Sequence, residues 1–185
     1  MPRILAVSGS PSARSRTLHV IKHLTTRVAV DTEWEVVTVR DAPPEALLGA
    51  DPSHPAIVDV AARISQADGL IVATPVYKAA YSGVLKALLD LLPQRALAGK
   101  VVLPLATGGS LAHVLAIDYA LRPVLTALGA AHVVPGYFLL DTWITEQDSG
   151  VSVEGAAAAA LDRVLATFLD TVATRASARV PTLAF

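Results

Sequence analysis

Short apolar runs alternate with helix-like segments along the whole of this chain. Five of the runs read as strands: Arg3–Val7, Trp34–Val39, Gly69–Thr74, Lys100–Ala106 and His132–Leu139. The run Gly69–Thr74 is apolar without alternation, as expected for a strand covered on both faces. The pattern therefore predicts strands that lie inside the molecule.

Helix signals fill the intervals between these runs. The predicted helices are a segment with apolar residues at Leu18, Ile21, Leu24 and Val28, then Ala56–Gln66, Gly83–Leu92, Leu111–Leu128 and Gly155–Ala176. Pro93 and Gly129 end two of them. The Pro-rich segment Asp41–Pro55 is expected to be a long, exposed connection.

Five strand–helix repeats predict an α/β fold, with a doubly wound, five-stranded parallel sheet and helices on both faces. We expect one domain over residues 1–185. Ligands of such sheets bind beyond the carboxyl ends of the strands. This rule points to three loops before any chemistry is considered: Ser8–Thr17, Pro75–Ser82 and Thr107–His113.

Composition narrows the possible partners. Charged residues make up 17% of the chain, below the usual share of about 25%, which leaves apolar surface for a subunit interface. A net charge of −1 argues against nucleic acid as a partner. The chain has no cysteine and no apolar run of membrane-spanning length. We expect a cytoplasmic protein with no secretory signal, no membrane helix and no thiolate chemistry.

The first loop has the composition of a phosphate site. It follows a strand and opens a helix, where amide groups and the helix dipole favour an anion. Its hydroxyl groups belong to Ser8, Ser10, Ser15 and Thr17, and its positive charge to Arg14 or Arg16. The glycine patterns of dinucleotide sites and P-loops are absent. We therefore predict a mononucleotide phosphate, as in FMN, against the alternative of an ordinary serine-capped loop.

The other two loops suit a flat ring. Pro75 and Tyr77 follow a core strand and offer an apolar, aromatic wall, although a plain turn with a tyrosine over the sheet end explains them as well. Gly108 and Gly109 let the backbone approach a flavin's carbonyl edge. The alternative for this loop is a glycine turn in which Ser110 caps the helix.

Two rival sites are disfavoured. The stretch Gly-Gly-Ser-Leu-Ala loosely resembles a nucleophile elbow at Ser110, but Ala112 replaces its last glycine and His132 begins a strand instead of lying in a late loop. His19 and His23 have the spacing of two metal ligands on one helix face, without a third ligand nearby. We expect a solvated helix face there and no metal site.

The stretch Asp68–Leu128, which contains "TPVYK" and "ATGGSLAHV", closely resembles the NADPH-dependent FMN reductases of two-component alkanesulfonate monooxygenase systems. The opening "SGSP" agrees with that family's phosphate loop. The resemblance covers Arg3–Ala131 and thins after Phe138, so that residues 139–153 are uninformative. The broader family often has Pro-Glu-Tyr-Asn where this chain has Val76 and Lys78, which favours the sulfonate-linked branch.

The resemblance implies a flavodoxin-like fold, a homotetramer, and transfer of a hydride from a reduced nicotinamide nucleotide, NADPH or NADH, to FMN. Reduced FMN would pass to a separate flavin-dependent alkanesulfonate monooxygenase that cleaves carbon–sulfur bonds for sulfur acquisition. It implies phosphate contacts from Ser8, Ser10, Ser15, Arg16 and Thr17. It implies ring contacts from Pro75, Val76, Tyr77 and Lys78, and pyrimidine-edge contacts from Thr107, Gly108, Gly109 and Ser110, with His113 nearby.

Pro123 carries a further expectation. It has no N–H, so the carbonyl of Tyr119 loses its helical partner, and a kink or π-bulge is expected inside Leu111–Leu128. The resemblance implies a short π-helix at Tyr119, at the tetramer interface near the flavin and linked to flavin export. Two alternatives stay open: a reductase of quinones, azo dyes or metal ions that retains its FMN, and a flavodoxin-like electron carrier.

Overall fold

The computed structural model describes residues 1–28, 32–147 and 150–178. Its centre is a parallel sheet in the order β2 (Glu33–Thr38), β1 (Arg3–Ser8), β3 (Gly69–Tyr77) and β5 (Val101–Gly108), with β6 (His132–Val133) and β7 (Tyr137–Leu140) both beside β5. The strand order reverses at β1, as in flavodoxin-like sheets. The predicted α/β class and flavodoxin-like order are confirmed.

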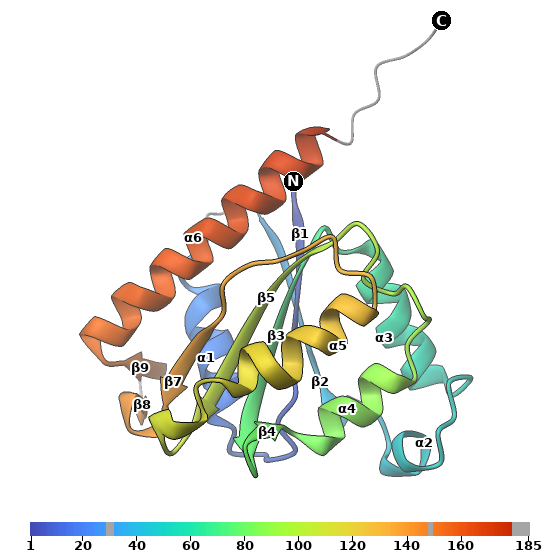
Figure 1. The fold of residues 1–185 in the computed structure, drawn as a ribbon, viewed down its shortest axis with the longest axis horizontal. Coiled ribbons are helices and arrows are strands. Elements are labelled where there is room, and N and C mark those ends of the chain that lie inside the picture. The colour runs from blue at the N-terminus through green and yellow to red at the C-terminus, as the bar shows by residue number, and fades with distance from the viewer. Residues whose placement is uncertain (29–31, 148–149, 179–185) are drawn as a thin grey trace, which may run out of the picture.

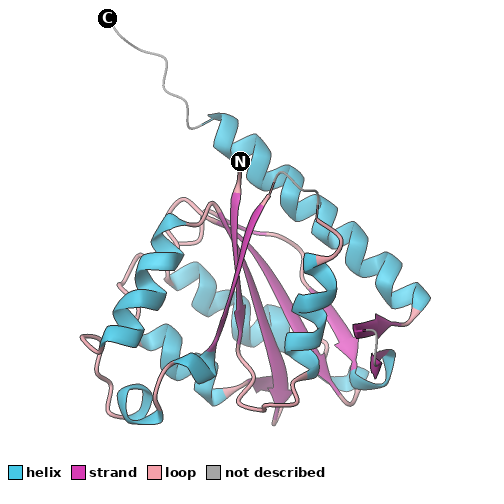
Figure 2. Ribbon diagram, turned by 180° about the vertical axis from the view of Figure 1, so that it is seen from behind, coloured by secondary structure: helices cyan, strands magenta, loops and turns pink. Residues whose placement is uncertain are grey.

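Helices cover both faces of the sheet (Figures 1 and 2). The two on one face are α1 (Arg16–Thr25) and α6 (Gly155–Ala178), and those on the other are α3 (Pro55–Gln66), α4 (Gly83–Asp90) and α5 (Arg122–Ala127). Alternate residues of β1 divide between the layers: Ile4 and Ala6 join the core under α1 and α6, and Leu5 and Val7 join the other core. Burial on both faces explains why the strands read as unbroken apolar runs.

The fifth predicted strand, His132–Leu139, is divided in two. Strands β6 and β7 are separated at Pro135 and Gly136. A side chain at Gly136 would meet the Pro104 carbonyl oxygen at 2.6 Å, so the chain passes too close to β5 for any larger residue. A proline and a close backbone approach thus interrupt the strand without moving it from the sheet.

The Pro-rich connection is not simply exposed. It forms a turn of 3-10 helix at Val39–Asp41 and the short helix α2 (Pro44–Leu48), which packs against α4. Ala42, Ala46 and Leu47 are buried in the core beside it. The apolar residues between the prolines give the reason, because they cover the end of the α3–α4 layer.

The predicted long helix consists of three pieces. A 3-10 turn at Leu111–His113 is followed by a π-helix at Ile117–Leu121 and then by α5. Pro123 lies in the first turn of α5, so its missing N–H falls beside the π-helix. The predicted bulge is confirmed and contains Tyr119.

Two hairpins complete the fold, and one of them changes the expected surroundings of His23. Strand β4 (Ala80–Tyr81) pairs antiparallel with the end of β3, and β8 (Ile144–Gln147) pairs with β9 (Gly150–Val153). Strand β9 packs against α1, and His23 is buried there. The expectation of a solvated face was wrong at His23, because the hairpin that covers it lies far along the chain and has no local sequence signal. In the described ranges no helix is both long enough and apolar enough to cross a membrane.

Candidate functional site

A cavity of about 250 Å³ opens at the carboxyl edge of the sheet, at the bottom of Figure 1, where all three predicted loops meet. The first loop lines it with Ser10, Ser15, Arg16 and Thr17. The second lines it with Pro75, Val76 and Tyr77, and the third with Thr107, Gly108 and Gly109. Ser12, Arg14 and Asp141 also line it. We refer to it as the edge cavity.

The first loop is held in place by hydrogen bonds at its base. The Gly9 amide donates to the Ala73 carbonyl at 2.7 Å, and the buried Ser82 hydroxyl donates to the Gly9 carbonyl. Ser82 also accepts from the Leu85 amide at 3.1 Å, and its own amide donates to Thr74 Oγ1 at 3.0 Å. One residue therefore connects the ends of β1 and β3 to the start of α4: its hydroxyl bonds Gly9 and Leu85, and its amide bonds Thr74.

The loop ends in a capped helix that faces the cavity. Ser15 Oγ accepts from the Leu18 amide at 3.0 Å and caps α1. The amides of Arg16 and Thr17 belong to the first turn, where the helix supplies no carbonyl partner. Such amides, with the positive end of the helix dipole, favour a bound anion.

Buried hydroxyl groups surround this helix start. Thr17 Oγ1 lies 2.7 Å from Thr107 Oγ1, which joins the first loop to the end of β5. Ser10 Oγ accepts from the Ser12 amide at 3.3 Å. Ser10, Ser15, Thr17 and Thr107 are each at most 4% exposed. Buried hydroxyls at a cavity wall are suitable donors for phosphate oxygens.

Asp141 is a site residue that the sequence analysis missed. It directly follows β7 and lies at the same edge of the sheet as the loops, with Oδ2 3.6 Å from Arg16 Nη1. The Arg16 side chain is 58% exposed, and pairs this open contribute about 0–1 kcal/mol. Arg16 is therefore able to turn toward a phosphate. The sequence signal that could have identified Asp141 is its position directly after an apolar strand.

A strained hairpin forms the second wall. Strand β3 turns into β4 through Lys78 and Ala79, whose φ angles are +51° and +66°. Two successive positive φ angles define a type I′ turn, which normally contains glycine or asparagine. The turn holds Tyr77 at the cavity, with half of its surface exposed. Burial raises the pKa of Tyr81 on the return strand, so its phenol is neutral at neutral pH.

The two glycines of the third loop differ in their surroundings. A β-carbon on Gly108 would lie 2.9 Å from Phe138 Cζ and 3.6 Å from Val76 Cβ. A β-carbon on Gly109 would meet nothing within 4 Å. Gly108 is required by protein packing, and the space beside Gly109 is open to a ligand.

Five predicted residues do not line the edge cavity: Ser8, Lys78, Ser110, His113 and Tyr119. Ser8 is buried within β1, and Ser110 caps the 3-10 turn by accepting from the Ala112 amide at 3.2 Å. Tyr119 is 79% exposed. Its π-helix packs against β4, so one hairpin separates it from the cavity. In the described part of the chain no group of three metal-ligating residues occurs.

The donor set fits a phosphate joined to a flat ring. The first loop lines the edge cavity with hydroxyls, first-turn amides and arginine, and the other two loops line it with Val76, Tyr77 and the glycine backbone. Comparison with known proteins agrees with this arrangement. Residues 2–145 match the family model described as NADPH-dependent FMN reductase. The chain belongs to the NADPH-dependent FMN reductase family.

Relatives within this flavin reductase family are close. The FMN reductase (NADPH) of Escherichia coli K12 is 50% identical over 145 residues, which cover 78% of this chain and 76% of that protein. The FMN reductase (NADPH) of Pseudomonas putida KT2440 is 52% identical over 143 residues, which cover 76% and 72%. The protein is thus an oxidoreductase, a flavin reductase that acts with FMN and a reduced nicotinamide nucleotide.

Comparison with solved structures agrees with the flavin reductase family and the flavodoxin-like fold. The apo form of the NADH:FMN oxidoreductase EMOB is 45% identical, with a TM-score of 0.78 over 91% of this chain and 88% of that one. Oxidised flavodoxin 1 of Bacillus cereus is 17% identical with a TM-score of 0.59, which shows the shared fold alone.

Proposed function

We propose that this single-domain flavin reductase binds FMN in the edge cavity and delivers reduced FMN to a flavin-dependent alkanesulfonate monooxygenase. The observation that carries the binding site is the meeting of an anion-binding helix start, an aromatic wall and an open glycine edge in one cavity. The sulfonate link rests on the resemblance of the "TPVYK" and "ATGGSLAHV" segments to that branch of the family. The reaction consumes a reduced nicotinamide nucleotide, so we place it in the cytoplasm.

Bound FMN supplies the ring that accepts a hydride from the nicotinamide. The residues of the chain orient that ring. Arg16 and the amides at the start of α1 hold the phosphate, with hydroxyls from Ser10, Ser15 and Thr17 around it. Tyr77 flanks the ring, and the Gly109 backbone lies against its pyrimidine edge, where amide donors stabilise the negative charge that develops on reduction.

We further propose that the π-helix face forms the interface of a homotetramer. Leu111, Val114, Leu115 and Tyr119 are each between 45% and 79% exposed. They follow one another along the segment before α5 and make an apolar surface that an isolated protomer leaves in water. Because the π-helix packs against β4, subunit contacts there are one hairpin away from the edge cavity.

The test is a two-stage assay. Purified protein is first inspected for flavin colour and assayed for NADPH oxidation with and without added FMN. A colourless protein that needs added FMN behaves as proposed. A yellow protein that needs a third acceptor is a reductase with retained flavin, and a yellow protein inert to nicotinamides is an electron carrier.

The second stage measures sulfite with the cognate monooxygenase, NADPH, oxygen and catalytic FMN. Chemically reduced FMN serves as the control that shows the monooxygenase to be competent. NADPH oxidation without sulfite from any alkanesulfonate, when chemically reduced FMN does give sulfite, would refute the partner and leave the flavin reductase intact.

A further inference from the structure

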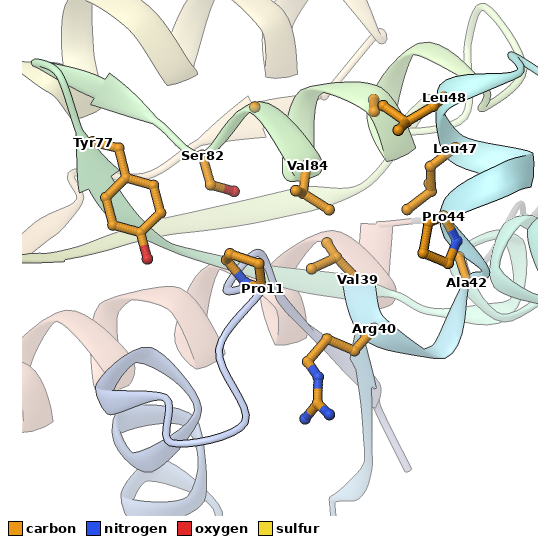
Figure 3. Close-up of a pocket in the computed structure, with 12 residues that line it drawn as sticks. Pro11, Val39, Arg40, Ala42, Pro44, Leu47, Leu48, Tyr77, Ser82 and Val84 are labelled. Atoms are coloured by element: carbon orange, nitrogen blue, oxygen red, sulfur yellow. The ribbon is translucent and has the colours of Figure 1, made fainter.

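A second, larger cavity lies beside the edge cavity. It measures about 540 Å³ and is formed by the exit of β2, by α2 and by the start of α4. Figure 3 shows its apolar side chains, among them Val39, Leu47 and Val84, gathered on one side of Tyr77. We refer to it as the α2–α4 cavity.

The two cavities adjoin at two points. Tyr77 borders both of them. Pro11 borders the α2–α4 cavity, while its neighbours Ser10 and Ser12 border the edge cavity. An extended molecule with one end against the flavin ring at Tyr77 therefore has its other end next to the apolar space.

Arg40 is the one charged residue among those that line the α2–α4 cavity. In residues 1–28, 32–147 and 150–178, no carboxylate pairs with its guanidinium. The adjacent Asp41 is occupied, since its carboxylate accepts from the Thr38 amide at 2.8 Å and from the Thr38 hydroxyl at 2.9 Å. An apolar space with an uncommitted arginine at its edge fits a flat ring that carries an anionic group.

We propose that the α2–α4 cavity receives the adenosine end of NADPH and that Arg40 binds its 2′-phosphate. This inference rests on the proposed placement of FMN in the edge cavity, which puts the nicotinamide at Tyr77. Adenine lies against Val39, Leu47 and Val84, and the ribose phosphate lies at the mouth. The 2′-phosphate is the group that separates NADPH from NADH, so Arg40 is a specificity-determining residue.

The substitution Arg40→Gln tests the phosphate contact. Loss of one charge-assisted contact raises the KM for NADPH by about tenfold or more, while the KM for NADH and the Kd for FMN stay unchanged. The matched control is Arg95→Gln, because Arg95 is also exposed but precedes β5, at the opposite edge of the sheet. That control leaves both nucleotide KM values unchanged.

A second variant tests the apolar wall. Leu48 borders the cavity beside Leu47 and is 85% exposed, so Leu48→Ser makes the apolar wall more polar without opening the core. Because NADPH and NADH share adenine, Leu48→Ser raises both KM values by the same factor. A sedimentation or size-exclusion run on this variant reveals the other possible occupant, a second copy of the chain, through a change in oligomeric state.

Direct binding separates this inference from the flavin reductase activity. Calorimetry with 2′,5′-ADP and with 5′-AMP as probes requires no turnover. Tighter binding of 2′,5′-ADP that Arg40→Gln abolishes supports the site even if FMN reduction is not detected. Equal binding of the two probes, or unchanged NADPH preference in Arg40→Gln, overturns it. Loss of the preference for NADPH in Arg14→Gln, and not in Arg40→Gln, would place the adenosine end in a different cavity beside α1, which Arg14, Arg16 and His19 line. That result would also overturn the proposal.

Discussion

Gly108 and Gly109 are neighbours in the sequence, but alanine should lower thermal stability at Gly108 and FMN affinity at Gly109. In Gly108→Ala the new methyl group would lie 2.9 Å from Phe138 Cζ, and Phe138 is only 4% exposed. Overpacking of this kind destabilises by about 1–3 kcal/mol. At about 2–4 °C per kcal/mol for a chain of this size, the midpoint of thermal unfolding should fall by about 2–12 °C.

In Gly109→Ala the methyl group meets no protein atom within 4 Å. Thermal unfolding of the flavin-free protein should therefore stay within about 1 °C of wild type, since surface changes contribute little. The methyl group occupies the space assigned to the pyrimidine edge, so FMN affinity should fall by about tenfold.

The assay is thermal unfolding without flavin, together with a fluorescence titration of FMN, on both variants and wild type. Each variant is the control for the other, because the substitution and the loop are the same. The reasoning is refuted if Gly109→Ala binds FMN as wild type does, or if it unfolds at a lower temperature than Gly108→Ala.

Three further outcomes are expected. FMN should bind at least about tenfold more tightly than riboflavin, because each lost charge-assisted contact contributes about 1.5–3 kcal/mol. Equal affinities in a fluorescence titration would refute the assignment of the phosphate to the edge cavity. Tyr119→Ala should fold normally, since Tyr119 is 79% exposed, but it should change flavin retention and loosen the proposed tetramer. Tyr119→Phe is the control, and wild-type colour, turnover and mass in the alanine variant would contradict the prediction. Burial, followed by the charge of Arg27, lowers the pKa of His23. The unfolded chain therefore binds the proton more tightly than the folded chain. The free energy of unfolding is then highest above a pH of about 6.5 and falls as the pH drops below that value. Urea unfolding from pH 8 to pH 5 should show this loss, and His23→Gln should weaken it.

The parallel sheet and the three loops were predictable because they depend on local patterns, and the flavodoxin-like strand order was implied by the family resemblance. Buried parallel strands read as apolar runs. A proline inside a helix removes a named hydrogen bond, so Pro123 predicted a kink or a bulge, and the family resemblance implied a π-helix at Tyr119. Chemistry at the carboxyl edge followed from the fold class, because parallel strands all end on the same side.

The features that were missed depend on contacts distant in sequence. The break between β6 and β7 comes from the approach of Gly136 to Pro104, and burial of His23 comes from a hairpin more than a hundred residues away. The turn at Lys78 and Ala79 has positive φ angles without glycine or asparagine, so the usual turn signal is absent. Asp141 becomes a site residue only when β7 is placed beside β5.

The bonds of Ser82 have a consequence for the speed of flavin exchange. They tie the base of the first loop to β3 and α4 before any ligand arrives. The bases of the first and second loops therefore do not have to be ordered during binding. Entropy that is already lost in folding is not lost again at each encounter. A reductase that loads and unloads flavin in every cycle, as proposed for this protein, would lose less ordering entropy at each association because the bases of its loops are already fixed.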